Sequence, residues 1–446
     1  MKTRLIHIFI VLLACCGLFS SCKDSEEERS RILKIYNWGD YIDESILEEF
    51  PAWYKEQTGE NVRIIYQVFD INEIMLTKVE LGHEDFDLIC PSEYIIERML
   101  RKNLLLPINR DFGKTPDYIK NVSPYIQEQL DKLSYDGRKT NDYVVPYMWG
   151  TAGLLYNKKF ISDEEVTSWE CLWDPKNKGR ILMKDSYRDA YGTAIIYANA
   201  ESLQNGTVTV EQLMNDSSPE AIALAEEYLK KLKPNIAGWE ADFGKEMMTR
   251  NKAWLNLTWS GDAMWSIQEA EAVGVDLGYD VPKEGSNIWY DGWAIPKFAR
   301  NVKAASYFID YLCRPDIALR NMDAIGYVSA IATPEILEAK MDTTITTLSD
   351  LSYFFGPEAK SIPINHVQYP DRAVVERCAM IRDFGDKTEQ VLEMWSRVKG
   401  DNLNTGIVLL IFTVFGILFV WIVYRRIVEY KQKNRHNRRR RKHPVK

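Results

Sequence analysis

Five short segments combine an aromatic side chain with a carboxylate, and each follows a segment that reads as a β-strand. Aromatic faces attract cations, with each contact worth about 0.5–2 kcal/mol. Carboxylates accept charge-assisted hydrogen bonds from ammonium groups. A flexible organic cation with an apolar stem needs both kinds of group. The segments are residues 36–41 (Tyr-Asn-Trp-Gly-Asp-Tyr), 91–94 (Pro-Ser-Glu-Tyr), 185–189 (Asp-Ser-Tyr-Arg-Asp), 259–262 (Trp-Ser-Gly-Asp) and 288–291 (Ile-Trp-Tyr-Asp).

The same segments also have a purely structural interpretation. The chain holds 13 Trp and 24 Tyr, so aromatic residues fall near Asp by chance. A single Trp close to an Asp is often a packing residue beside a helix cap. Arg188 could neutralise Asp185 or Asp189, which would make that segment structural. The recurrence of the pattern after successive strands, rather than any one segment, favours a binding site.

The elements that must position these segments alternate between strand and helix patterns. Such alternation predicts βαβ units and a parallel sheet, and two such series predict two lobes. Ligands of open α/β sheets lie beyond the carboxyl ends of the strands. The expected strands are residues 32–36, 61–69, 86–90, 143–155, 180–183, 254–259 and 275–281, and the expected helices are residues 44–58, 71–81, 190–200, 221–232, 303–313 and 315–324.

The two ends of the chain carry targeting signals. Lys2 and Arg4 precede an apolar run at 6–19 and then Cys22, which predicts a signal peptide with a lipobox over 1–22 and lipidation of Cys22. Ordinary cleavage nearby, without modification of Cys22, is the alternative. The charged and Ser-rich residues 23–31 are expected to form a solvated tether.

Near the other end, residues 406–424 contain no charged side chain and would span about 28 Å as a helix. This length predicts a transmembrane helix. The tail 425–446 carries 11 Lys and Arg and one Glu, and the positive-inside bias places it in the cytoplasm. The alternative is a buried core helix followed by a nucleic-acid-binding tail, but a core helix rarely ends in a cationic block.

Charge and cysteine content agree with an extracytoplasmic domain. The net charge is −8, and without the tail's +10 it becomes −18. An acidic domain suits cationic ligands, although acidity also serves solubility. The four cysteines beyond the signal region are widely spaced and form no CxxC motif, so we expect mainly buried free thiols there. These are Cys90, Cys171, Cys313 and Cys378.

Several motifs together make the resemblance to a known family specific. Residues 36–41 look like the opening motif of the spermidine/putrescine-binding proteins of bacterial ABC transporters, and the resemblance covers roughly residues 32–400. That family implies a two-lobed type II periplasmic-binding-protein fold with a hinge cleft. The further motifs are residues 90–94 (Cys-Pro-Ser-Glu-Tyr), 145–150 (Val-Pro-Tyr-Met-Trp-Gly), 167–173 (Thr-Ser-Trp-Glu-Cys-Leu-Trp), 281–285 (Val-Pro-Lys-Glu-Gly) and 325–327 (Ile-Gly-Tyr).

The resemblance also implies the lobes and the ligand contacts. Lobe 1 would hold residues 32–145 and 292–335, and lobe 2 would hold residues 146–291 and 336–400. Asp262 stands where putrescine-preferring members carry Asp, which favours putrescine over spermidine. The aromatic box would be Trp38, Tyr41, Tyr94, Trp259 and Trp289, and the polar contacts would be Asp40, Asp189, Asp262, Asp291, Ser92 and Tyr327.

The family implies a periplasmic domain that delivers polyamines to ABC transporter permease subunits. The C-terminal span and basic tail depart from the family, whose members normally end with the binding domain, and they suggest that this domain is held at the inner membrane beside the permease. No cofactor, metal or nucleic acid is implied. An enzyme is disfavoured because residues 23–400 hold only His83 and His366 and no HExxH, GxSxG or P-loop pattern. The paired carboxylates could in principle serve glycoside hydrolysis. A membrane-tethered polyamine-sensing receptor is the main alternative. Capture of ferric iron through Tyr residues is disfavoured because the candidate positions hold Trp and Asp.

Overall fold

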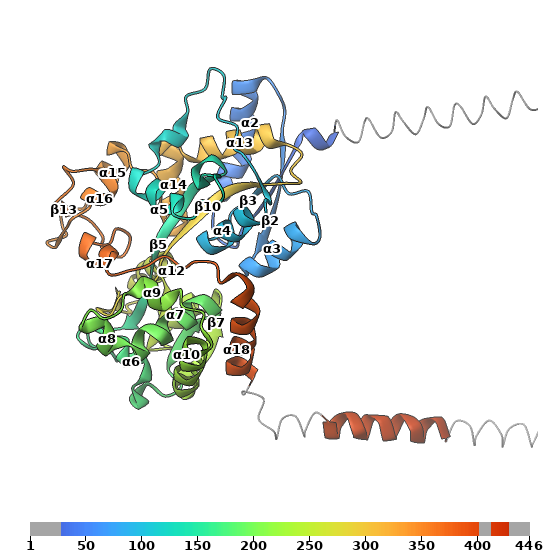
Figure 1. Cartoon of the computed structure of the whole chain (residues 1–446), viewed down its shortest axis with the longest axis vertical. Coiled ribbons are helices and arrows are strands. Elements are labelled where there is room, and N and C mark those ends of the chain that lie inside the picture. Colours follow the sequence, from blue (N-terminus) through green and yellow to red (C-terminus); the bar gives the residue numbers. More distant parts are fainter. Residues whose placement is uncertain (1–27, 401–411, 428–446) are drawn as a thin grey trace, which may run out of the picture. The chain divides into compact units, whose positions relative to one another are not determined.

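A computed structural model describes residues 28–400 and 412–427 of the chain. The chain divides into two compact units, one up to Val391 and one after it. Figure 1 shows two lobes in the first unit: β1, β2 and β3 lie in one with α2, α3, α4 and α13, and β7 lies in the other with α6, α7, α8 and α10. The predicted two-lobed α/β fold is confirmed.

One mixed sheet runs through both lobes, in the order β2-β1-β3-β10-β5-β8-β6-β7, with β4 beside β10 and with β9 and β11 beside β5. Its strands are β1 (Ile32–Trp38), β2 (Arg63–Phe69), β3 (Leu88–Ile89), β4 (Leu105–Leu106), β5 (Val144–Asn157), β6 (Ile181–Lys184), β7 (Ile236–Glu240), β8 (Leu255–Trp259), β9 (Leu277–Asp280), β10 (Ile288–Pro296) and β11 (Val328–Ser329). A separate ribbon pairs β12 (Leu348–Ser349) with β13 (Ile362–Pro363).

The predicted all-parallel sheet is correct only away from the centre. β1 pairs in parallel with β2 and β3, and β6 pairs in parallel with β7 and β8. Between them, β5 and β10 are antiparallel to each other and to the strands that flank them. β5 is buried along its whole length: its first part pairs with β10 and its second part with β8 and β9. The two lobes therefore share a strand.

The helices follow one another along the chain in the order in which they are numbered. They are α2 (Glu44–Thr58), α3 (Asn72–Glu80), α4 (Glu93–Arg101), α5 (Pro124–Asp131), α6 (Glu170–Trp173), α7 (Tyr187–Ala198), α8 (Ala200–Gln204), α9 (Val210–Met214), α10 (Pro219–Leu232), α11 (Phe243–Thr249), α12 (Ser260–Ala272), α13 (Val302–Leu312), α14 (Pro315–Ile325), α15 (Pro334–Lys340), α16 (Ser352–Phe355), α17 (Arg372–Glu376) and α18 (Thr388–Gly400).

Local capping explains where two of these helices begin and end. The Asp43 side chain accepts a hydrogen bond from the Ser45 backbone, which starts α2, and Gly59 ends it with a φ of 75°. Ser186 caps α7 by accepting from the backbone N–H of Asp189. α7 thus begins three residues before the predicted helix at 190–200, which places Asp189 in its first turn.

Two contacts concern the predicted domain boundaries, which stay predictions. Arg29, within the predicted tether 23–31, forms ion pairs with Asp85 at 2.7 Å and with Asp87 at 3.0 Å. α16, within the predicted lobe-2 segment 336–400, packs on α5 through the hydrogen bond from Ser123 Oγ to the Phe354 carbonyl. Residues 1–27, including Cys22, lie outside the described residues.

The predicted transmembrane segment 406–424 begins among residues 401–411, which are also outside the described residues. The structure shows a helix over 412–427 whose residues are all exposed. Within the described ranges, no helix combines the length and apolar character needed to cross a membrane. The membrane span stays a prediction, as does the cytoplasmic tail.

The cysteine prediction is confirmed for the four positions that the structure describes. Cys90, Cys171 and Cys313 are buried free thiols, and Cys378 is a half-buried free thiol. Burial is the largest factor that raises the pKa of the Cys378 thiol, to about 12. These thiols therefore stay protonated at neutral pH and act as small apolar side chains.

Candidate functional site

Asp291 lies in the middle of β10, where the register of that strand against β5 shifts between Tyr290 and Gly292. Such irregularities re-aim a side chain out of the regular sheet pattern. The Tyr41 hydroxyl donates a hydrogen bond of 2.7 Å to Asp291 Oδ2, and Ser92 pairs with Asp291 across an isolated bridge. Its other oxygen, Oδ1, is buried without a hydrogen-bond partner in the described chain.

The pKa of Asp291 is raised to about 6, mainly by burial and in smaller part by the nearby Asp189 carboxylate, while hydrogen bonds from Ser92 and Tyr41 lower it. Buried polar atoms are almost always hydrogen-bonded. A buried carboxylate oxygen without a partner therefore marks a place where a donor, most favourably a cationic one, would lower the free energy.

Asp189 lies near Asp291, because its carboxylate contributes to the raised pKa of Asp291. Asp189 Oδ2 accepts a hydrogen bond of 3.2 Å from the Trp259 indole N–H, and its Oδ1 accepts one of 3.1 Å from the Asn287 amide. Its place in the first turn of α7 favours a negative charge there. Neither Asp189 nor Asp291 forms an ion pair with any residue in 28–400 or 412–427. The two carboxylates thus form an anionic pair without a basic partner in the described chain.

Aromatic rings from both lobes surround this pair. Trp38, at the end of β1, and Trp259, at the end of β8, lie edge to face with ring centroids 6.5 Å apart. Tyr327 packs against Tyr41 at 5.0 Å and against Trp289 at 5.6 Å. The predicted aromatic box is therefore assembled from segments that are far apart in the sequence.

Ser92 and Tyr94 are linked through a residue that the sequence did not single out. The Asn72 amide donates hydrogen bonds to Ser92 Oγ at 3.0 Å and to the Tyr94 hydroxyl at 3.2 Å. The Tyr94 hydroxyl donates in turn to Glu73 Oε1 at 2.9 Å. Tyr94 therefore lies beside the site and is linked to it through Asn72.

Glu93 is a second residue that the sequence did not assign. It is fully buried at the start of α4 and accepts a hydrogen bond of 3.0 Å from the Tyr290 backbone N–H. Burial holds its pKa well above the usual range, and the nearby Asp291 and Asp189 carboxylates raise it further. The sequence signal for Glu93 was its position directly before Tyr94, within the segment 91–94 that was predicted to contribute to the site.

Asp262 is in the site but is already occupied by the protein's own cation. Lys184 Nζ lies 2.6 Å from Asp262 Oδ2, and the Tyr327 hydroxyl donates a hydrogen bond of 2.8 Å to Asp262 Oδ1. Burial alone would raise the pKa of Asp262, but Lys184 and the more distant Lys245 outweigh it and lower the pKa. Asp262 therefore has a cationic partner within the protein, and its role as a ligand contact stays a prediction.

Asp40 does not join the buried group. Its side chain is 84% exposed, its backbone has a φ of 49°, and its ion pair is with Lys245 Nζ at 3.8 Å. Asp40 therefore lies at the rim. Of the eleven predicted residues, the structure brings nine into one connected group, places Tyr94 beside it and leaves Asp40 outside. The nine are Trp38, Tyr41, Ser92, Asp189, Trp259, Asp262, Trp289, Asp291 and Tyr327.

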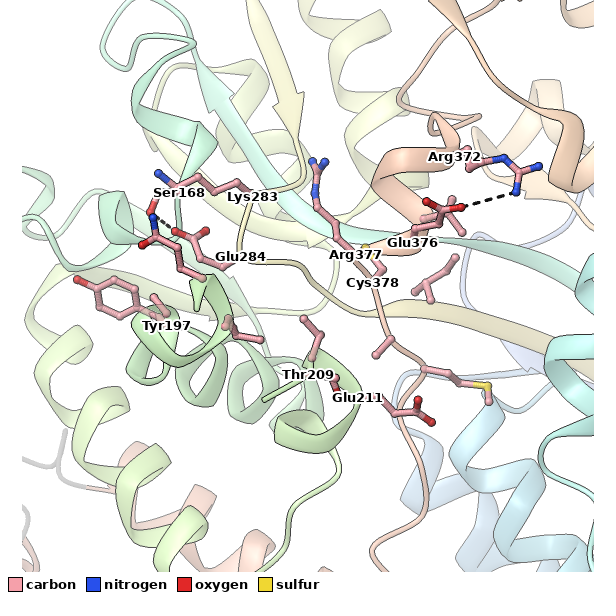
Figure 2. Close-up of a pocket in the computed structure, with 18 of the residues that line it drawn as sticks. Ser168, Tyr197, Thr209, Glu211, Lys283, Glu284, Arg372, Glu376, Arg377 and Cys378 are labelled. Carbon is pink, nitrogen blue, oxygen red and sulfur yellow. Dashed lines mark hydrogen bonds and ion pairs between the residues drawn. The ribbon is translucent and has the colours of Figure 1, made fainter. Parts of the chain in front are cut away.

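A separate pocket of about 1170 Å³ contains none of the predicted residues. Figure 2 shows its lining of mixed charge, with Glu284 bonded to Ser168 and Glu376 paired with Arg372. Lys283 and Arg377 add positive charge to the same wall. This lining includes Tyr125, Tyr197 and Tyr353 but holds no buried carboxylate oxygen that lacks a partner in the described chain, as Asp291 Oδ1 does, so we take the Asp189–Asp291 site as the candidate functional site. In the described residues, no group of three or more His, Cys, Asp or Glu could hold a metal ion.

Known proteins are similar to this chain over most of its length. The chain is 28% identical over 389 residues to the spermidine/putrescine-binding periplasmic protein of Salmonella typhimurium, covering 87% of this chain and 97% of that protein. It is 28% identical over 318 residues to the putrescine-binding periplasmic protein PotF of Escherichia coli, covering 68% of this chain and 80% of that protein.

A solved structure agrees with these relatives. The spermidine/putrescine ABC transporter substrate-binding protein PotD of Streptococcus pneumoniae superposes with a TM-score of 0.60 at 30% identity, covering 83% of this chain and 98% of that protein. The resemblance stated from the motifs is thereby confirmed, and so is the prediction of a binding protein rather than an enzyme. The family model for bacterial extracellular solute-binding proteins matches residues 52–347, and the chain belongs to that family.

Proposed function

We propose that this protein binds a polyamine, with putrescine favoured over spermidine, in the Asp189–Asp291 site and delivers it to the permease of an ABC transporter. The observation that carries the proposal is Asp291, whose Oδ1 is buried without a partner next to a second carboxylate that has no basic neighbour in the described chain. The aromatic rings of Trp38, Trp259 and Trp289 supply faces for a methylene stem. The relatives from Salmonella typhimurium and Escherichia coli are named as spermidine/putrescine-binding and putrescine-binding proteins, respectively, and both amines are ligands of this kind.

Titration calorimetry of the full chain in detergent, against putrescine, cadaverine, spermidine and spermine, tests this proposal. Saturable binding of at least one amine supports it, and the amine recovered unchanged distinguishes binding from turnover. A folded protein that gives no heat with any of the four contradicts it. Uptake of a labelled amine by cells with and without the protein then tests delivery to a permease.

We also propose that the ligand-binding unit is periplasmic and held at the inner membrane by residues 406–424, with the tail 425–446 in the cytoplasm. In the described part of this segment, large apolar side chains are exposed on all sides of the helix, among them Phe412 at 72% and Phe419 at 69%. A helix that is apolar all round needs an apolar environment. The full chain should stay with membranes at alkaline pH, whereas a chain that stops at Gly400 and carries Cys22→Ala should be released. Retention of the shortened chain would contradict the anchor.

A further inference from the structure

Lys184 places a fully buried positive charge inside the site. It ends the apolar strand β6 and is 1% exposed. Its ammonium group lies 2.6 Å from Asp262 Oδ2, 3.2 Å from Glu240 Oε1 and 4.5 Å from the centroid of the Trp259 ring. A carboxylate on one side and an aromatic face on the other are the surroundings that the proposed ligand's own ammonium requires.

The end of the site formed by Asp189 and Asp291 and the end formed by Asp262 and Lys184 therefore differ in charge. Asp189 and Asp291 have no cationic partner in the described residues, whereas Asp262 is neutralised. Tyr327 connects the two ends, because its ring packs against Tyr41 and its hydroxyl donates to Asp262. A ligand ammonium that reached Asp262 would have to displace Lys184 and leave that buried cation without its carboxylate, which is costly.

We infer that Lys184 is a specificity residue that occupies one ammonium subsite, so that the site accepts short amines with few charges and discriminates against triamines and tetraamines. The inference rests on the proposed function and deepens it. Putrescine, with two ammonium groups, can use the Asp189–Asp291 end without approaching Asp262. Spermidine is longer and carries a third ammonium, which has no free carboxylate at the Lys184 end.

Calorimetry of the full chain with putrescine and spermidine tests the inference. We expect the wild-type protein to bind putrescine at least about tenfold more tightly than spermidine. Lys184→Met should shift the ratio of the two affinities toward spermidine by about tenfold or more, because it removes the ammonium that lies 2.6 Å from Asp262 Oδ2. Adding Asp262→Asn to Lys184→Met should reverse that shift, since the Asp262 carboxylate is then no longer present to receive a third ligand ammonium.

Lys184→Met leaves buried carboxylates unpaired and can lower stability, so a melting curve must accompany each titration. Lys184→Gln removes the charge but keeps an N–H donor for Asp262, and it should shift the ratio in the same direction. The inference is overturned if a folded Lys184 variant keeps the wild-type ratio or if the double variant keeps the shift. It is also overturned if the wild-type protein binds spermidine as tightly as putrescine. A wild-type protein that binds neither amine contradicts the proposed function itself.

Discussion

At the scale of single residues, Asp291 and Asp310 are both buried acids with one oxygen that has no partner in the described chain and with a second carboxylate nearby. They differ in the partners of the other oxygen. Asp310 Oδ1 accepts hydrogen bonds from the backbone N–H groups of Tyr118 and Ile119, whereas Asp291 Oδ2 accepts one from the side chain of Tyr41, which packs against Tyr327. Asp310 therefore holds the fold together, whereas Asp291 lies in the candidate site.

Replacing Asp291 should therefore remove affinity without removing the fold. Asp291→Asn eliminates the charge that would pair with a ligand ammonium, and we expect affinity for putrescine to fall at least about thirtyfold. Calorimetry measures the affinity, and a thermal melt shows whether the fold is retained. Asp310→Asn is the matched control, which should lower the melting temperature and keep the affinity. Equal affinity losses in the two variants would remove Asp291 from the site.

The raised pKa of Asp291 also predicts a pH dependence with opposite signs for folding and for binding. Because its pKa is about 6 in the folded protein and about 4 when unfolded, Asp291 contributes stability below pH 4 that is lost as the pH rises through 6. Binding needs the ionised form, so affinity should be about tenfold weaker at pH 5 than at pH 7.5. Calorimetry at both pH values measures this difference, and Asp291→Asn should abolish it.

The sequence showed which residue types could form the site, but it did not show which residues pair with one another in the folded protein. The recurrence of Trp and Asp after strands located Trp38, Asp189, Trp259 and Asp291. That recurrence could not show that Asp262 forms an ion pair with Lys184. The ion pair joins the end of β6 to the start of α12 and therefore exists only in the folded chain. The sequence also could not show that Asp40 lies at the rim, because its left-handed φ is a property of the folded backbone.

At the scale of elements, alternation and capping predicted most strands and helices, and the bounds of α2 agree with the prediction at both ends. The antiparallel pairing of β5 and β10 was missed because both strands are buried along their whole length, and no local pattern encodes the direction of such strands. Gly150 in β5 shows what the pairing requires. A Cβ at this position would meet the Trp289 ring at 2.7 Å and would overlap Ser260 Oγ.

We therefore expect that the Trp289 ring can take its position only because residue 150 has no side chain. Gly150→Ala would push the indole out of position, and we expect a loss of about 1–3 kcal/mol in the free energy of unfolding, together with weaker amine binding. Urea denaturation and calorimetry measure the two effects. Gly192→Ala in α7 is the control, because its Cβ would meet only the flexible end of Met214 and a helical Ala is favoured by about 1 kcal/mol over Gly. Unchanged binding in Gly150→Ala would show that Trp289 is not a ligand contact.

At the scale of the whole molecule, charge is distributed unevenly along the chain. The net charge of −8 hides a tail of +10 and an acidic remainder of −18. An acidic domain attracts cations over distances set by the Debye length, which is about 10 Å at 0.1 M salt.

This distribution predicts an effect on the rate of association. Raising the salt from about 50 mM to about 500 mM should slow putrescine association severalfold, with a much smaller change in dissociation. Stopped-flow tryptophan fluorescence can follow both steps, because Trp38, Trp259 and Trp289 frame the site. A salt effect confined to dissociation would contradict long-range attraction and point to the direct ion pairs alone.

The ion pairs of Arg29 with Asp85 and Asp87 have a consequence for how far the ligand-binding unit can travel. Seven peptide steps separate Cys22 from Arg29. At about 3.3–3.6 Å per residue, a fully stretched chain of that length reaches about 25 Å. If Cys22 carries a lipid, the point where the folded domain begins can never be farther than this from the membrane surface. Such a short tether would keep the domain close to the membrane surface, so that it would meet permeases by diffusion within the membrane plane rather than by diffusion through the periplasm.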